Sequence, residues 1–339
     1  MSGNSRVVCG DGRFSALLAW VERDLGLHVQ NWQMLAGDAS ARCYLRLWTG
    51  VGSAIAMLAP SSENAKAFVA VAELLRRVGM RVPAIYAQHV KLGFWLLEDF
   101  GDLTYFHALQ SGLNESLYEA ALAALSRLQT QLDPASANLP AYDEALLRRE
   151  LDIFHQWLAK GWLGIEMPKT MWEKAIETLV ASALEQPKVV VHRDYHSRNL
   201  MVLPEKTPGV LDFQDAVVGP VTYDVVSLLR DCYLVWPPAW VKRQLEAHRL
   251  HLAQAGMKIS ADAWQIWVDR MGAQRHLKAA GIFARLHLRD GKSGYLQDIP
   301  RTLDYVVEVA REDLKLHQLG QFLQVEVLPR VRERLACGR

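Results

Sequence analysis

The sequence lacks several features that would identify common classes of protein. It has only four cysteines in 339 residues, Cys9, Cys43, Cys232 and Cys337, and no C-x-x-C pair. Such spacing is typical of free thiols in a reducing compartment and excludes a disulfide framework or a cysteine zinc site. The first residues lack the apolar stretch of a secretory signal, and no run approaches the roughly 18 apolar residues that cross a bilayer. We therefore expect a cytoplasmic protein that does not bind a membrane.

The sequence also has little excess charge of either sign. Its 38 Lys and Arg residues nearly balance 37 Asp and Glu residues, for a net charge of +1, so we expect no nucleic-acid partner. G-x-G-x-x-G and H-E-x-x-H are absent, and Gly291-Lys292-Ser293 lacks the earlier glycine of a P-loop because Leu286 stands at that position. Hydrophobic residues are plentiful at 50%, enough for two lobes at this length.

The first hundred residues read mainly as strands. Apolar spacing predicts a helix over residues 14–25 and another that ends at Gly79. Short β-type runs bounded by glycines, prolines and serines predict strands over residues 32–36, 43–49, 53–58, 85–90 and 94–97. The resulting order is three strands, a helix and two strands.

After Gly101 the pattern becomes mostly helical. We expect helices over residues 117–132, 143–160 and 169–185, short strands over 188–191, 200–203 and 209–211, and helices from residue 223 onward. The simplest division is a strand-rich nucleotide-binding lobe, residues 1–98, and a larger helical lobe, residues 99–339, that holds the catalytic loop and the acceptor site.

The segment from His192 to Asp212 contains the residues that most clearly indicate a chemical function. His192-Arg193-Asp194 is followed by Asn199, in the pattern H-R-D-x-x-x-x-N, and Asp212 lies thirteen residues beyond Asn199. Transfer of a phosphoryl group to an alcohol needs a base for the hydroxyl proton and oxygen ligands for magnesium at the nucleotide phosphates. Asp194 fits the base, and Asn199 and Asp212 fit the metal ligands. The alternative is a loop in which these side chains only cap turns. We interpret His192 as a brace of the loop rather than a proton carrier.

These motifs resemble the aminoglycoside phosphotransferase and choline kinase superfamily. Residues 192–231 read HRDYHSRNLMVLPEKTPGVLDFQDAVVGPVTYDVVSLLRD, and GDASARCYLRL, LLEDFGD and ARLHLRDGKSGYLQDIPR extend the likeness over nearly the whole chain. The closest resemblance is to the kinases of cell-wall recycling that phosphorylate the anomeric hydroxyl of N-acetylmuramate and N-acetylglucosamine. The resemblance implies an α+β, protein-kinase-like fold with a small antiparallel-sheet N-lobe and a mainly helical C-lobe. It also implies the cofactors ATP and Mg²⁺, and a role for Asp224 in bracing the catalytic loop through backbone amides; an N-cap is an equal and compatible alternative.

The residues that would bind the nucleotide are less well defined by the sequence. Gly37, Ser40 and Arg42 lie in the turn that this fold uses to cover phosphates, where backbone amides and a hydroxyl could reach the oxygens. Met57 stands where kinases carry a strand-3 lysine, so Arg42 is the candidate cation, with a surface arginine as the alternative. Leu96–Gly101 resembles the hinge that meets adenine through backbone groups, which makes Glu98 and Phe100 candidate nucleotide-binding residues; a solvated acidic pair is the alternative.

Candidates for the acceptor site are Arg198, Gln214 and Asp215, which are next to the catalytic residues in sequence, and Arg285 and Arg289, which lie in the late resembling segment. A muramic acid acceptor would bring a carboxylate, for which a cation is expected. Each candidate could equally form a surface salt bridge.

Three functions remain open from the sequence. The first is a kinase of amino sugars, and the second is another small-molecule kinase of this fold, for choline, homoserine or an aminoglycoside. The third is a pseudokinase, which Met57 in place of lysine keeps open. The sequence leaves the oligomeric state undetermined.

Overall fold

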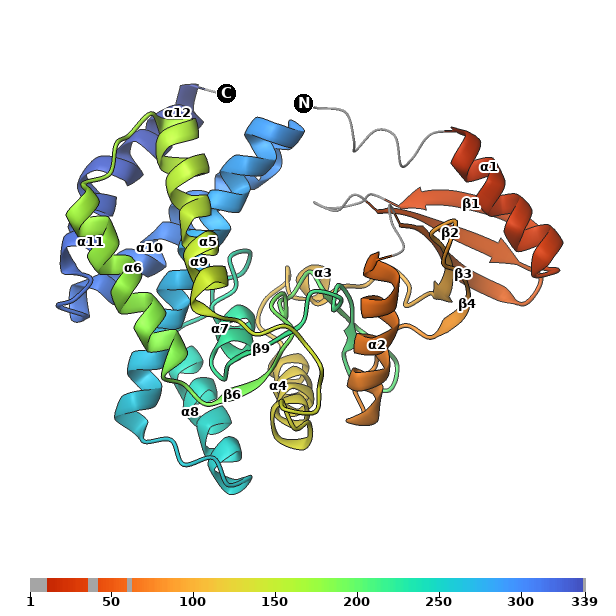
Figure 1. Ribbon diagram of the computed structural model, residues 1–339, viewed down its shortest axis with the longest axis horizontal. Coiled ribbons are helices and arrows are strands. Elements are labelled where there is room, and N and C mark those ends of the chain that lie inside the picture. Colours follow the sequence, from red (N-terminus) through yellow and green to blue (C-terminus); the bar gives the residue numbers. More distant parts are fainter. Residues whose placement is uncertain (1–10, 36–41, 60–62, 338–339) are drawn as a thin grey trace. The chain divides into compact units, whose positions relative to one another are not determined.

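The structure is a computed structural model that describes residues 11–35, 42–59 and 63–337. The chain forms two compact units (Figure 1). The first unit comprises Met1–Tyr105 and Leu200–Asp215, and the second comprises Phe106–Asn199 and Ala216–Arg339.

The first unit is built on a five-stranded antiparallel sheet with the strand order β1-β2-β3-β5-β4. Its elements are α1 (Asp11–Ala19), the π-helix η1 (Trp20–Asp24), β1 (Val29–Leu35), β2 (Cys43–Thr49), β3 (Gly52–Leu58), α2 (Glu63–Arg77), β4 (Ile85–His89), β5 (Phe94–Glu98), and the hairpin of β7 (Leu200–Met201) and β8 (Gly209–Val210). The expected helix over residues 14–25 thus begins earlier and changes to a π-helix at Trp20.

Alternation along the strands gives the sheet two different faces. One face packs against α1 and η1 in an apolar cluster that includes Leu17, Trp20, Leu45, Ala56 and Leu96. The residues between them, at the next positions of β2, β3 and β5, lie on the opposite face: Tyr44, Arg46, Ile55, Met57, Trp95 and Leu97. Helix α2 meets this second face, since Phe68 packs edge-on against Trp95 with 5.3 Å between ring centroids.

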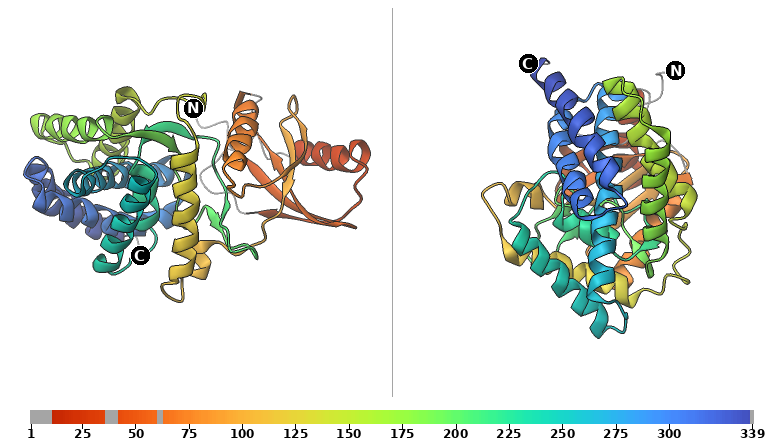
Figure 2. Two further views of the ribbon diagram at one scale, coloured as in Figure 1. Left: turned by 90° about the horizontal axis from the view of Figure 1, so that it is seen from below. Right: turned by 90° about the vertical axis from the view of Figure 1, so that its left-hand side faces the viewer.

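The second unit is mainly helical (Figure 2). Its elements are α3 (Tyr105–Ala108), which begins at the last residue of the first unit, α4 (Glu115–Gln131), α5 (Glu144–Ile153), η2 (Phe154–Leu163), α6 (Lys169–Leu184), β6 (Lys188–Val191), β9 (Val217–Pro220), α7 (Tyr223–Leu229), α8 (Pro238–Gln254), α9 (Ala261–Asp290), η3 (Ser293–Asp298), α10 (Ile299–Glu312), α11 (His317–Phe322), η4 (Leu323–Val327) and α12 (Leu328–Cys337).

Helix α9 is the centre of the second unit and packs against η2, α10, α6, α5 and α7. The close approach depends on glycine, because a Cβ on Gly281 would lie 2.6 Å from the backbone of Ile153 and Phe154. Ser260 caps its first turn by accepting a hydrogen bond from Ala263 N, and Gly291, at φ +70°, ends it in the left-handed region. Side chains in the middle of α9 are consequently surrounded by protein on nearly every side.

Most expected elements are present, and the corrections below add to the π-helix that begins at Trp20. The expected helix over residues 143–160 divides into α5 and the π-helix η2, and β9, which pairs with β6, was not expected. The expectation of free thiols holds for Cys232 and Cys337, whereas Cys43 is disulfide-bonded. Within the described ranges, every helix is too short or too polar to cross a membrane.

Candidate active site

The loop that follows β6 carries the H-R-D motif and is folded by its own hydrogen bonds. The backbone N–H of Asp194 donates to His192 Nδ1 at 3.2 Å, and the carbonyl of Asp194 accepts from His196 N and from Asn199 Nδ2, each at 3.0 Å. Arg193 adopts φ +77°, an unusual value for a residue with a side chain. The loop therefore turns sharply, and Asn199 is oriented by its amide nitrogen, with its amide oxygen at the other end of the group.

Two buried carboxylates fix this loop by accepting hydrogen bonds from it. Asp224, in the first turn of α7, accepts the backbone N–H groups of His192 at 2.7 Å and Arg193 at 2.9 Å. Asp231, after α7, accepts the backbone N–H and the hydroxyl of Ser197. Burial raises the pKa of Asp224 to about 7, so the two amide donors only partly offset burial. The helix cap suggested as an alternative is not its role, because Thr222 precedes α7 at the N-cap.

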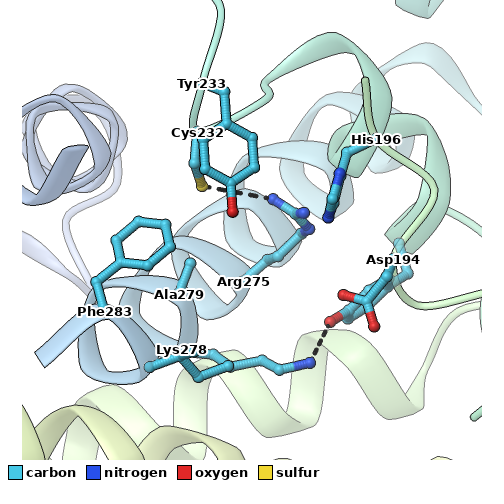
Figure 3. A pocket seen from close by; sticks show the side chains of 10 residues that line it. Asp194, His196, Cys232, Tyr233, Arg275, Lys278, Ala279 and Phe283 are labelled. Carbon is cyan, nitrogen blue, oxygen red and sulfur yellow. Dashed lines mark hydrogen bonds between the residues drawn. The ribbon is translucent and has the colours of Figure 1, made fainter. Parts of the chain in front are cut away.

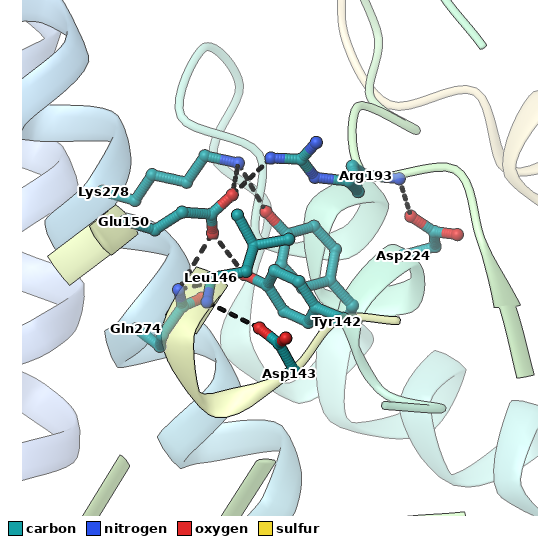
Figure 4. Close-up of polar contacts among 9 residues, drawn as sticks. Tyr142, Asp143, Leu146, Glu150, Arg193, Asp224, Gln274 and Lys278 are labelled. Carbon is teal, nitrogen blue, oxygen red and sulfur yellow. Dashed lines mark hydrogen bonds and ion pairs between the residues drawn. The ribbon is translucent and has the colours of Figure 1, made fainter. Parts of the chain in front are cut away.

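A third carboxylate, Glu150 of α5, pairs with two cations next to the loop (Figure 4). Its side chain is 4% exposed and forms ion pairs with Arg193 and with Lys278, the latter at 2.9 Å. Tyr142 and Gln274 donate further hydrogen bonds to it. Burial by itself raises the pKa of Glu150, but the charges of Lys278 and Arg193 outweigh that effect and hold its pKa below the usual value.

Asp194 lines a pocket within the second unit (Figure 3). The pocket encloses about 440 Å³, including the part open to solvent. Its walls come from the catalytic loop, from both ends of α7 and from one face of α9: Asp194, His196, Tyr223, Cys232, Tyr233, Arg275, Lys278, Ala279, Ile282 and Phe283. The α9 residues follow helical i, i+3, i+4 and i+7 spacing, which places them on one side of that helix. The charged residues of this lining are two cations and one carboxylate.

The electrostatics of the pocket suit a charged base. Burial by itself raises the pKa of Asp194, but positive charge, chiefly that of Lys278, outweighs it, so its pKa lies below the usual value. Lys278 also donates to the Tyr223 hydroxyl at 2.9 Å, which fixes the position of the ammonium group. Burial lowers the pKa of His196, so this imidazole is neutral at neutral pH. Asp194 is therefore a carboxylate with a neutral imidazole and two cations around it.

Asp212 lies in the first unit, in the segment after β8, with φ +60°. Its carboxylate accepts a hydrogen bond from Gln214 Nε2 at 2.8 Å. Burial raises the pKa of Tyr44, and the electrostatic contributions to that shift come from Arg42, which also hydrogen-bonds to it, and from Asp212. Arg42 is buried, with its guanidinium carbon 5.8 Å from the centroid of the Phe68 ring. Arg42 and Asp212 thus share the surroundings of Tyr44, on the sheet face opposite α1.

The expected hinge is fixed by arginine side chains of its own unit. The carboxylate of Glu98 pairs with Arg81 and accepts Ala84 N at 3.1 Å, while Glu98 N donates to Ala84 O. The side chain of Glu98 therefore stabilises the unit. The Phe100 ring packs 4.9 Å from the Arg81 guanidinium carbon. Within the described ranges no hydrogen bond involves the backbone N–H or C=O of Phe100, which are the groups a hinge would offer to adenine.

The other predicted residues lie apart from the pocket lining. Arg198 stacks on aromatic rings, with its guanidinium carbon 3.8 Å from the centroid of Tyr233, which does line the pocket. Arg285 and Arg289 lie further along α9, and Arg289 is exposed and paired with Asp290 at 2.8 Å. Gln214 and Asp215 belong to the first unit. Gly37 and Ser40 lie outside the described residues.

The sequence analysis missed Arg275, Lys278 and Glu150. A usable signal was present for the first two, because they stand among the small residues Gly272, Ala273, Ala279, Ala280 and Gly281 in the middle of a long helix. Small residues on several sides of a helix indicate close packing all round, so charged groups between them have to be buried and have a role. Glu150 had no such signal, since charges along α5 resemble an ordinary solvated face.

Magnesium is the metal that the resemblance implies, and the available donors fit it. Magnesium takes few protein ligands, with nucleotide phosphates and water completing six oxygens. In the part of the chain that the structure describes, no three His, Cys, Asp or Glu side chains gather into a metal-binding group. Asn199, in the second unit, offers an amide oxygen and Asp212, in the first unit, a carboxylate, which are donor types that magnesium accepts.

Solved structures with similar architecture establish the fold class. A spectinomycin phosphotransferase in complex with ADP and spectinomycin aligns with a TM-score of 0.61 over 87% of this chain and 93% of that chain, at 14% identity. A type I macrolide 2'-phosphotransferase aligns with a TM-score of 0.59 over 86% and 97%, at 16% identity. The protein has the protein-kinase-like fold of small-molecule phosphotransferases, which confirms the predicted fold class.

Sequence relatives define the family. Residues 31–258 match the phosphotransferase enzyme family. An N-acetylmuramate/N-acetylglucosamine kinase of Pseudomonas aeruginosa is 43% identical over 92% of this chain and 96% of that protein. A kinase of the same name from Pseudomonas putida is 42% identical over 85% and 86%. The chain belongs to the phosphotransferase enzyme family, and the resemblance drawn from its motifs is confirmed.

Proposed function

We propose that this protein is an ATP-dependent kinase that phosphorylates the anomeric hydroxyl of N-acetylmuramate and N-acetylglucosamine, in the recycling of cell-wall sugars. The observation that carries the proposal is the pocket of the second unit, which brings the Asp194 carboxylate together with cations and aromatic side chains. The names of the Pseudomonas relatives supply the sugars. Residues 1–98 would hold the nucleotide and residues 99–339 the acceptor. A cytoplasmic location, where ATP is available, follows from this function.

The pocket chemistry favours a sugar acceptor over a cationic one. Choline and aminoglycosides carry positive charge and need carboxylates or aromatic faces for it. The lining provides Arg275 and Lys278 against the single carboxylate Asp194. The rings of Tyr233 and Phe283, 6.0 Å apart between centroids, offer apolar surface to a pyranose.

In the proposed reaction the chain's own groups position the acceptor and accept its proton. The Asp194 carboxylate, charged at neutral pH because of Lys278, accepts the hydroxyl proton as the oxygen attacks the γ-phosphate; the bond from the γ-phosphorus to the bridging oxygen breaks and ADP leaves. Asp224, Asp231 and Glu150 hold the loop so that this carboxylate stays in place. Asn199 and Asp212 would hold the magnesium, which supplies positive charge at the phosphates, and Arg42 would add a further cation there.

The direct test is incubation of the purified protein with ATP, magnesium and each sugar, followed by mass spectrometry and phosphorus NMR of the product. The expected product is the 1-phosphate of each sugar. Choline, homoserine and an aminoglycoside serve as alternative acceptors. Phosphorylation of one of these without either sugar would replace the sugar assignment. ATP binding without transfer to any acceptor would identify a pseudokinase.

A further inference from the structure

The pocket contains a buried cation, Arg275, that forms no ion pair with a carboxylate within the described residues, although the charges of Asp231 and Asp194 act on it from further away. Arg275 is 5% exposed and lines the pocket from α9 (Figure 3). Its hydrogen bond to protein is a weak one, from Nη1 to Cys232 Sγ at 3.7 Å. Within the described ranges no Asp or Glu oxygen lies within the 4.0 Å limit of an ion pair with its guanidinium group.

Three other cations on or beside α9 are paired, the buried Lys278 and the partly buried Arg270 and Arg230, whereas the partly buried Arg285 forms no ion pair within the described ranges. Lys278, one turn further along α9, has Glu150 at 2.9 Å. Arg270 of the same helix has Asp313 at 2.7 Å, and Arg230 has Asp269 at 2.7 Å. A buried charge that lacks a directly hydrogen-bonded carboxylate is destabilising, even with more distant carboxylates around it. Its retention at a pocket wall indicates that a ligand supplies the missing negative charge.

The chemistry of a guanidinium group limits the chemical class of ligand that Arg275 would bind. Its planar, forked donors match a carboxylate or a phosphate with two parallel hydrogen bonds. Of the two proposed acceptors, N-acetylmuramate carries a carboxylate on its lactyl ether, whereas N-acetylglucosamine has a hydroxyl at that carbon. The transferred phosphoryl group is the other possible anion. The phosphoryl group is transferred to both sugars, whereas only one sugar carries the carboxylate. Comparing the kinetics of the two sugars therefore shows which of these anions Arg275 binds.

We propose that Arg275 binds the lactyl carboxylate of N-acetylmuramate and thereby makes the pocket selective for the acidic sugar. This inference rests on the proposed function. It assigns specificity to a residue of the pocket wall, while Lys278 pairs with Glu150 and donates to the Tyr223 hydroxyl.

The test compares kcat/KM for the two sugars and for the carboxamide of N-acetylmuramate, which has the same shape without the charge. Wild-type protein should prefer the acid to the carboxamide by at least about tenfold, as for a charge-assisted bidentate contact. Arg275→Gln should reduce the ratio of kcat/KM for N-acetylmuramate to that for N-acetylglucosamine by at least about tenfold. Arg270→Gln, on the same helix but outside the pocket lining, is the matched control and should keep the ratio.

Several outcomes would overturn the inference. Equal loss on both sugars in Arg275→Gln would assign the charge to the phosphoryl group. A change of the ratio in Arg285→Gln instead would move the carboxylate site along α9. If the glutamine variant does not fold, Arg275→Lys keeps the charge without the fork, and an unchanged preference for the acid over the carboxamide in it, or no preference in the wild type, would contradict the proposal. No turnover of either sugar by the wild type would remove the proposed function and this inference together.

Discussion

The two units hold their functional segments with charges of opposite sign. In the first unit, arginine side chains fix the segment after β5: Arg46 pairs with Asp99 at 2.7 Å and with Asp102 at 2.6 Å, and Arg81 pairs with Glu98. In the second unit, the carboxylates of Asp224 and Asp231 fix the loop after β6 by accepting its backbone N–H groups.

This difference decides which cations remain to bind the acceptor and which remain to bind the nucleotide phosphates. Carboxylates that bind backbone amides require no side-chain cation, so Arg275 is left for the pocket, whereas Lys278 pairs with Glu150. In the first unit, Arg46 and Arg81 are engaged by acidic partners and are poor candidates for binding phosphates. Arg42, which shares the surroundings of Tyr44 with Asp212, is the better candidate to replace the lysine that Met57 displaces.

The largest effect is expected for Asp194→Asn. The amide cannot accept the hydroxyl proton, so turnover should fall by about 10² to 10⁴-fold while the fold and nucleotide affinity are kept. Coupled detection of ADP measures the turnover, and thermal unfolding checks the fold. Asp133→Asn, in an exposed loop, is the control and should behave as wild type. Near-normal turnover of Asp194→Asn would contradict its role as the base.

Glu150→Gln tests whether buried charge supports the second unit. The variant leaves Lys278 and Arg193 without their shared carboxylate, so the free energy of unfolding at pH 7 should fall by about 3–5 kcal/mol. The pKa of Glu150 is lowered in the folded protein. Its stabilisation is therefore complete above its unfolded pKa of about 4.3 and is lost as the pH falls through the folded pKa. The difference from wild type should shrink in acid.

The control for this variant lies on the same helix. Glu144 is exposed and pairs with Arg148 one turn away. Glu144→Gln should change stability by no more than about 0.5 kcal/mol, measured by urea denaturation at the same pH values. A loss as large as that of Glu150→Gln would mean that burial does not distinguish the two carboxylates.

Asp212→Ala tests the nucleotide side. If Asp212 holds magnesium, the affinity for magnesium-ATP should fall by at least about tenfold, or 1.4 kcal/mol, in a calorimetric titration. Affinity for ATP without magnesium should change little, and this comparison is the internal control. Equal affinity of wild type and variant for magnesium-ATP would remove Asp212 from the metal site.

The sequence predicted those parts of the molecule whose residues are close together in the chain. The H-R-D-x-x-x-x-N motif lies within eight residues and its loop is folded by local hydrogen bonds, so Asp194 and Asn199 could be recognised without coordinates. The strands of the sheet were recognisable for the same reason, because glycines and prolines mark their ends. β9 was not, since its last two residues are Gly219 and Pro220, which are typical of a turn rather than of a strand.

The walls of the pocket could not be predicted in this way. Arg275 and Lys278 approach Asp194 because α9 packs through the centre of the second unit, and that packing depends on contacts such as Gly281 against Ile153, far apart in sequence. Arg285 and Arg289 were preferred because they lay in a resembling segment. Their position along α9 beyond the pocket lining follows from the packing of the helix, which charge and spacing alone do not reveal.

The smallest effect is expected for the arginine pair of the first unit. The side chain of Arg81 is 34% exposed, so water already solvates part of its charge. Arg81→Met keeps the aliphatic contact with the Phe100 ring and removes the ion pair with Glu98, and it should cost no more than about 1 kcal/mol. A double-mutant cycle with Glu98→Gln isolates the pair. A coupling energy of about 3 kcal/mol would reach the range expected for Glu150. The partly exposed arginine pair would then stabilise the first unit as strongly as the buried carboxylate stabilises the second. That result would contradict the contrast between the units.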